Sequence, residues 1–161
     1  ADADLFGRIE NTTFEALRTD TDLLTDAVSA AIRVKADIVE RDEHESGDRR
    51  KLNLGHTLAH AIEKCTNRLN HGEAVAVGTA LIADASVKLG VLAAEDRDRI
   101  AGVLKKLGFD LTPPVDVKRL LKEVDKDKKN EDGMLRIVVP VGIGDCDVRR
   151  MSHDEFAALF A

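Results

Sequence analysis

The stretch RRKLNLGHTLAHAIEK, residues 49–64, combines an apolar helix surface with one polar face. On a helix, alternate steps of four and three residues follow one narrow face. Along this stretch those steps select only polar residues, namely Arg49, Asn53, His56, His60 and Glu63. Leucine, alanine and isoleucine occupy most of the remaining circumference. The pattern predicts a largely buried helix over 49–64 whose polar face meets either water or an enclosed polar site.

Apolar residues repeat at helical spacing on both sides of this stretch. Further helices are predicted at the start of the chain, over 20–40, from 71 to a stop at Gly90, from 94 to a stop at Gly108, over 115–124, and after Ser152 to Ala161. The segment 71–90 is apolar on most sides, which places it at the centre of a bundle. Over 135–144, β-branched residues, Pro140 and two glycines indicate a small hairpin. We expect a mainly α fold, with residues 1–161 forming a single helical bundle domain that carries one small β-hairpin.

Composition and charge argue against several classes of protein. The net charge of -6 does not suit a binder of nucleic-acid phosphates, whose affinity depends on clustered Lys and Arg. The two cysteines, Cys65 and Cys146, are too few for a disulfide framework and lack CxxC spacing. No apolar run reaches the roughly 18 residues that span a bilayer, and no signal peptide is recognisable. We expect a cytoplasmic protein that binds neither nucleic acid nor membrane.

His56 and His60 stand four residues apart, the usual spacing for two imidazoles that one helix offers to a metal ion. Thr57 follows the first of them where a zinc protease needs Glu, so the motif excludes that class. His71 follows shortly and allows three imidazoles to converge across a helix-turn-helix. The alternative is that these histidines are merely solvated. Glu43, Glu45 and Glu73 are candidate ligands, bases or partners of imidazole N–H groups, with capping and surface charge as their alternative.

Basic residues near the polar face indicate the chemistry of a ligand. Arg49 opens the face, Lys35 lies on the preceding predicted helix, and Lys128 and Lys129 lie in a charged turn. Arg and Lys that converge on a pocket suit an anionic substrate, and a phosphorylated one in particular. The alternative for each lysine is a solvated surface charge.

Two motifs carry a resemblance to a known family. The pattern DExExGxRxxLNxGHTxxHAIE, here 42–63, is followed by HGEAVAxG at 71–78. Together they closely resemble the signature of 3-dehydroquinate synthases. The segments ADADLF at the start, KADIVERDE from Lys35 and DKKNEDGMLRIVVPVGIGD near the end are similar to further parts of that family, in the same order. The resemblance therefore covers nearly the whole chain and is weakest between Gly90 and Asp125.

The resemblance implies a lyase of the shikimate pathway, which leads to the aromatic amino acids. The family converts a seven-carbon sugar acid phosphate, DAHP, into 3-dehydroquinate with release of phosphate. It uses NAD and a divalent metal, usually zinc, with cobalt as another candidate. The implied chemistry is oxidation of an alcohol by NAD, elimination of phosphate, reduction of the carbonyl, ring opening and intramolecular aldol closure.

The resemblance also implies roles for individual residues. His56 and His71 match the two metal-binding imidazoles, and His60 matches a histidine that contacts substrate and relays protons. Substrate-binding positions are matched by Arg49, Asn53, Lys35 and one of Lys128 and Lys129, and Glu45 matches an acidic residue at the metal site.

One part of the family's pattern is missing from the sequence. The family's third metal ligand is a Glu in a GxAExxK-like segment before ADADLF, and that segment and the NAD-binding Rossmann-type domain are both absent. We therefore expect this chain alone to be inactive and not to bind NAD, to need that N-terminal domain as its partner, and to be compatible with a homodimer. The alternatives are another sugar-phosphate cyclase of the same superfamily and a non-catalytic helical interaction module.

Overall fold

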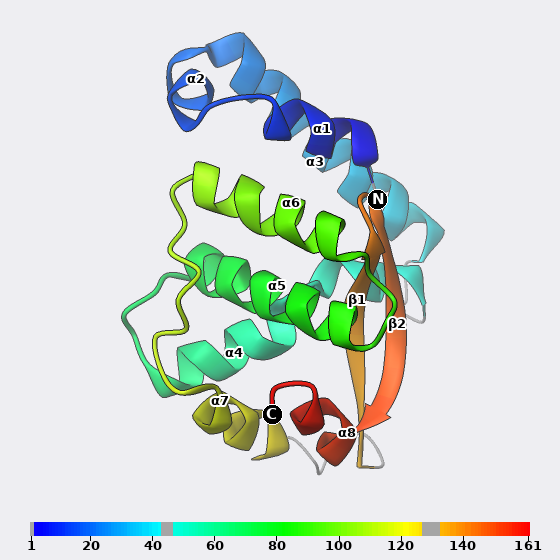
Figure 1. Cartoon of the computed structure of the whole chain (residues 1–161). Helices are drawn as coiled ribbons and strands as arrows, with labels where there is room; N and C mark the ends of the chain where they lie inside the picture. Colours follow the sequence, from blue (N-terminus) through cyan, green and yellow to red (C-terminus); the bar gives the residue numbers. More distant parts are fainter. Residues whose placement is uncertain (1, 43–46, 127–132) are drawn as a thin grey trace.

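The computed structural model describes residues 2–42, 47–126 and 133–161. The elements in chain order are α1 (Ala3–Glu10), α2 (Phe14–Thr19), α3 (Thr21–Arg41), the 3-10 helix η1 (Asp48–Asn53), α4 (His56–Cys65), α5 (His71–Lys88), α6 (Ala94–Lys106), α7 (Val117–Asp125), β1 (Met134–Gly142), β2 (Asp145–Ser152) and α8 (His153–Ala158) (Figure 1). This arrangement confirms the mainly α class with one hairpin. The short helix α2 was not predicted, and the last helix ends three residues before Ala161.

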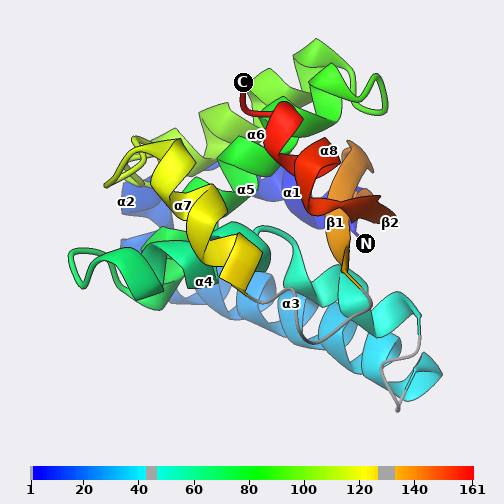
Figure 2. The ribbon, with the colours of Figure 1, turned by 90° about the horizontal axis from the view of Figure 1, so that it is seen from below.

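Helix α5 lies at the centre of the molecule, between α4 and α6 (Figure 1). It is apolar around most of its circumference, so the surrounding elements bury it on several sides. The core around it contains Leu58 and Ile62 of α4, Leu120 and Val124 of α7, Ile137 and Val139 of β1, and Phe156 of α8. Figure 2 shows α3 as a long helix along one side of this body, where it packs on η1.

The single helix predicted over 49–64 is wrong, because the chain forms two helical pieces there. Residues 48–53 are the 3-10 helix η1, and α4 begins only at His56. Between them Gly55 has a φ of 79°, a left-handed conformation that interrupts a helix and suits glycine. The helical face predicted for this stretch therefore holds only from His56 to Glu63, and Arg49 and Asn53 belong to η1.

Two glycines allow α4 to start directly against α5. A methyl group on Gly78 of α5 would come within 2.3 Å of the Gly55 carbonyl oxygen. A methyl group on Gly55 would come within 2.5 Å of Thr79 Oγ1. Backbone therefore lies against backbone at this crossing, and the first turn of α4 is fixed relative to α5.

The hairpin is longer than predicted. The stretch 135–144 is β1 and the turn, while the second strand is the unpredicted segment Asp145–Ser152. The strands pair antiparallel, with Val138 opposite Val148. Figure 1 shows the hairpin running from α8 to the start of α1, where Gly144 packs so tightly on Ala3 that a methyl group would lie 2.7 Å from the Ala3 nitrogen.

Within the described part of the chain, no helix is both long and apolar enough to cross a membrane.

Candidate metal and substrate site

Three imidazole rings converge where α4 packs on α5. His56 is the first residue of α4, His60 lies one turn later, and His71 is the first residue of α5. The ring centroids of His56 and His71 are 5.3 Å apart. Those of His56 and His60 are 5.8 Å apart, and those of His60 and His71 are 6.4 Å apart. The crossing of two helices thus brings together three rings whose positions in sequence span 16 residues.

Two of these rings have one nitrogen engaged and the other available. His56 Nδ1 lies 3.2 Å from the carbonyl oxygen of Leu54, and His71 Nδ1 lies 2.9 Å from Glu63 Oε1. A carbonyl oxygen or an ionised carboxylate can only accept, so in a neutral ring Nδ1 carries the proton and donates it. Nε2 is then left with its lone pair. Histidines that bind metals through Nε2 are held in this way.

The distance between ring centroids suits two ligands of one metal ion better for His56 and His71 than for the other two pairs of rings. On a tetrahedral zinc ion with Zn–N distances of about 2.0–2.1 Å, two imidazole centroids lie about 5 Å apart. The 5.3 Å between His56 and His71 matches this value, whereas both distances to His60 are longer. No described group hydrogen-bonds to the His60 ring, which is free to serve another function.

The described residues do not supply enough ligands for a complete zinc site. Within 2–42, 47–126 and 133–161, no three His, Cys, Asp or Glu side chains are grouped so that they could hold a metal ion. Catalytic zinc normally has three protein ligands. His56 and His71 therefore fit as two members of a site that requires a further ligand.

Glu63 is a site residue whose partner was not predicted from the sequence. It is the last member of the polar face of α4, seven residues after His56, and its carboxylate reaches His71 on the next helix. The sequence did offer one signal for Glu63, namely its position on the same helix face as His56 and His60. Glu73, which was a candidate, instead closes a capping box: its Oε2 accepts the Asn70 N–H at 2.8 Å, and its own N–H donates to Asn70 Oδ1 at 3.0 Å.

Arg49 and Asn53 precede the imidazoles on η1, where Arg49 is half-buried and Asn53 is exposed. The buried carboxylate of Asp42 holds the start of η1. Its Oδ2 accepts the backbone N–H of Gly47 at 2.7 Å and that of Arg49 at 3.0 Å. The position of Arg49 is therefore set through its backbone.

The remaining predicted residues are placed only in part. Lys35 is exposed on α3, the helix that packs on η1. Glu45, Lys128 and Lys129 lie outside the described residues, as does Glu43. Among the described residues, the structure therefore brings together the three imidazoles and Glu63, while Arg49 and Asn53 lie on η1, which precedes α4.

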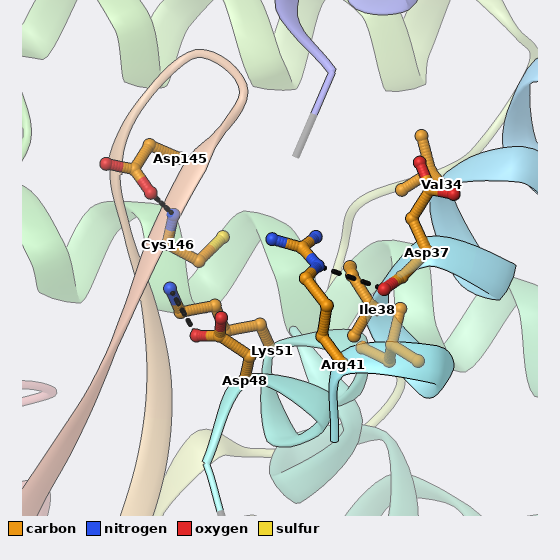
Figure 3. Close-up of a pocket in the computed structure, with 9 residues that line it drawn as sticks. Val34, Asp37, Ile38, Arg41, Asp48, Lys51, Asp145 and Cys146 are labelled. Atoms are coloured by element: carbon orange, nitrogen blue, oxygen red, sulfur yellow. Dashed lines mark hydrogen bonds and ion pairs between the residues drawn. The ribbon is translucent and has the colours of Figure 1, made fainter. Parts of the chain in front are cut away.

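A separate pocket of about 260 Å³ lies between α3, η1 and the start of β2 (Figure 3). Its cations are engaged: Lys51 Nζ lies 3.0 Å from Asp48 Oδ1, and Arg41 Nε donates to the Asp37 carbonyl at 2.9 Å. The hydrogen bond to Asp48 raises the pKa of Lys51, and burial raises the pKa of the Cys146 thiol. A thiol with a raised pKa is a poor nucleophile. Of the predicted site residues that the structure describes, none lines this pocket.

The family model and the curated relatives that resemble this chain point to the same family. Residues 1–130 match the family described as 3-dehydroquinate synthase C-terminal. The chain is 42% identical over 154 residues to the 3-dehydroquinate synthase of Ruegeria sp. (strain TM1040), covering 89% of this chain and 41% of that protein. It is 46% identical over 130 residues to that of Ruegeria pomeroyi, covering 74% and 35%. The chain thus spans less than half the length of these relatives.

Solved structures show the same fold at low sequence identity. The 2-epi-5-epi-valiolone synthase of Streptomyces hygroscopicus subsp. jinggangensis, solved with NAD+ and Zn2+ bound, superposes with a TM-score of 0.84 at 22% identity, covering 99% of this chain and 46% of that one. A 2-deoxy-scyllo-inosose synthase complexed with carbaglucose-6-phosphate, NAD+ and Co2+ gives 0.77 at 19% identity, covering 96% and 48%.

Proposed function

Since this chain belongs to the 3-dehydroquinate synthase family and matches its C-terminal domain, we propose that it forms the metal- and substrate-binding half of an enzyme that converts DAHP to 3-dehydroquinate. The reaction releases phosphate and belongs to the shikimate pathway. The convergence of His56, His60 and His71 at the α4–α5 crossing carries the proposal, because it gathers the histidines that match the family's motif.

His56 and His71 are proposed to hold a divalent metal, zinc or cobalt, through Nε2. Both rings have Nδ1 engaged by an acceptor, and their separation fits a tetrahedral ion. A metal bound there would lower the pKa of a coordinated hydroxyl and polarise a carbonyl. The structural relatives solved with NAD+ together with Zn2+ or Co2+ support this choice of cofactors.

The surrounding residues are proposed to bind the substrate and to move protons. His60 lies next to both proposed ligands and has a ring without a described hydrogen-bond partner, which suits a group that contacts substrate and relays protons. Arg49, Asn53 and Lys35 would bind the carboxylate, hydroxyl and phosphate groups of the sugar acid. Glu45 is proposed as an acid–base group at the metal, and one of Lys128 and Lys129 as a further phosphate contact.

The active enzyme is proposed to combine this chain with an N-terminal dinucleotide-binding domain that binds NAD and contributes the third metal ligand. Residues 1–161 alone are then expected neither to bind NAD nor to turn over substrate. A cytoplasmic location and a homodimer are part of the same proposal.

The test is an assay of the proposed full-length enzyme with DAHP, NAD and zinc. Release of phosphate together with formation of 3-dehydroquinate is the expected result, and His56→Ala should abolish both. Zinc content measured on the same samples shows whether the loss follows the metal. Failure to form 3-dehydroquinate with a fully metal-loaded protein would overturn the proposal.

A second candidate is another sugar-phosphate cyclase, because solved enzymes of that kind share this fold. The same protein should then release phosphate from a different sugar phosphate and leave DAHP unchanged. Running the assay in parallel on hexose and heptose phosphates separates the two activities.

A further inference from the structure

Glu63 links the two helices that carry the imidazoles. It lies in the last turn of α4, and its Oε1 is 2.9 Å from Nδ1 of His71, the first residue of α5. The carboxylate is about one-third exposed and the imidazole more than half exposed. A side chain this exposed at a helix start has several rotamers available, so the contact with Glu63 restricts it.

We infer that Glu63 is a positioning residue, which fixes the tautomer and ring orientation of His71 so that its Nε2 is presented towards His56. This inference rests on the metal site of the proposed function. An ionised carboxylate only accepts hydrogen bonds, so it selects the ring form that carries the proton on Nδ1. The resulting lone pair on Nε2 lies on the opposite side of the ring from Glu63.

The two proposed ligands differ in how they are held. His56 Nδ1 donates to the backbone carbonyl of Leu54, which no side-chain substitution removes. His71 Nδ1 donates to a side chain, Glu63, from another helix. His71 is therefore the ligand whose orientation depends on one replaceable residue and on the packing of α4 against α5.

The first test measures the tautomers in the absence of metal. Long-range 1H–15N correlation spectra at about pH 8, where ordinary imidazoles are neutral, distinguish Nδ1–H from Nε2–H rings. His71 is expected as the Nδ1–H form in the unchanged chain and as a mixture in Glu63→Ala. Glu63→Gln keeps an acceptor oxygen and should restore part of the preference. Glu95→Gln, an exposed carboxylate on α6, should leave His71 unchanged.

His60 provides an internal comparison in the same spectra, because no described group hydrogen-bonds to its ring. Its tautomer mixture should not change with the Glu63 substitutions. An Nδ1–H ring at His71 in Glu63→Ala would overturn the inference. Far-UV circular dichroism of each variant establishes that the helices are intact.

The second test measures how tightly the proposed full-length enzyme and its variants bind Co2+ and Zn2+, by competition with a chelating dye. Loss of a partner that orients a ligating imidazole typically weakens metal binding by about 10–100-fold, and this is expected for Glu63→Ala. If His56→Ala and His71→Ala leave the affinity unchanged, the metal site of the proposed function fails. If those two variants weaken binding and Glu63→Ala does not, only the role of Glu63 fails.

Discussion

At the scale of single residues, the three histidines differ in what holds their rings. A backbone carbonyl engages His56 and a carboxylate engages His71, whereas no described hydrogen bond constrains His60. A metal ligand benefits from a fixed lone pair. A proton relay instead needs a nitrogen that can reach the substrate. The geometry therefore favours a division of roles between the two held rings and the third.

The division of roles predicts different phenotypes for two substitutions in the proposed full-length enzyme. His60→Ala should retain its zinc and lose turnover by about 100–10,000-fold, the usual contribution of an acid–base group. His71→Ala should lose zinc and turnover together. Zinc analysis and a phosphate-release assay on both variants give the comparison. Loss of zinc from His60→Ala with retention in His71→Ala would assign the chelate to His56 and His60 instead.

The sequence predicted part of this site through local spacing. His56, His60 and Glu63 share one face of α4, as their spacing requires. The contact between Glu63 and His71 depends on how the turn at 66–70 folds α5 back on α4, which spacing within one helix does not determine. Arg49 and Asn53 were assigned to the same face only because the break at Gly55 was not predicted.

At the scale of elements, apolar periodicity continues across a break in the helix. Leu54, Leu58 and Ile62 recur at steps of four residues, as in one helix, but the left-handed Gly55 separates η1 from α4. A glycine inside a helical pattern is often tolerated, so the sequence alone gave no reason to end the helix there. The decisive contact is with Gly78, which is 23 residues further along the chain.

Gly78→Ala should destabilise the protein and disturb the imidazole cluster. Its methyl group would lie 2.3 Å from the Gly55 oxygen, so α4 must move away from α5. We expect a loss of about 1–3 kcal/mol in the free energy of unfolding and weaker metal binding. Gly102→Ala on α6 is the matched control, because nothing lies within 4 Å of its added methyl group. That change should stabilise the helix by about 0.5–1 kcal/mol, as measured by urea unfolding.

The packing of α1 on α6 should depend on pH. Arg99 Nε and Nη2 each lie 2.8 Å from a carboxylate oxygen of Glu10, and this hydrogen bonding lowers the pKa of Glu10. A lowered pKa stabilises the fold above the ordinary glutamate value of about 4.3, and the contribution is lost as the pH falls through the lower folded value. Glu10→Gln should therefore melt at a lower temperature than the unchanged chain at pH 7, and the difference should vanish in acid.

Glu15→Gln is the control for this pH dependence. The Glu15 carboxylate lies 4.0 Å from Arg18 Nε on an exposed surface, and such pairs contribute little. Its melting temperature should follow that of the unchanged chain at every pH. Equal behaviour of the two variants would contradict a specific role for the Glu10–Arg99 pair.

At the scale of the whole molecule, α4, α5, α7, β1 and α8 share one core. Leu120 of α7 is fully buried in it, so Leu120→Ala should lower the free energy of unfolding by about 2–5 kcal/mol. Leu24 of α3 is 45% exposed, and Leu24→Ala should stay within about 0.5 kcal/mol. Urea unfolding followed by circular dichroism measures both, and similar losses would contradict this description of the core.

The helical architecture was predictable because apolar periodicity and glycine stops are local signals. Gly90 and Gly108 end α5 and α6 with positive φ values, and Ser152 and Glu155 form the predicted capping box. The second strand was not predicted, because DCDVRRMS is largely polar and becomes a strand through its pairing with β1. Pairing between strands is decided by tertiary contacts more than by intrinsic preference.

The contacts of α1 with distant parts of the chain have a consequence for synthesis on the ribosome. Glu10 pairs with Arg99, 89 residues later, and Ala3 packs against the hairpin turn at Gly144. At about 5–20 residues per second, translation from Ala3 to Gly144 takes on the order of ten seconds. The contact of Phe6 with Arg99 can form only after Arg99 has been made, and the contact of Ala3 with the hairpin turn only at the end of that interval. Within residues 1–161, α1 is therefore synthesised well before the partners that complete its packing.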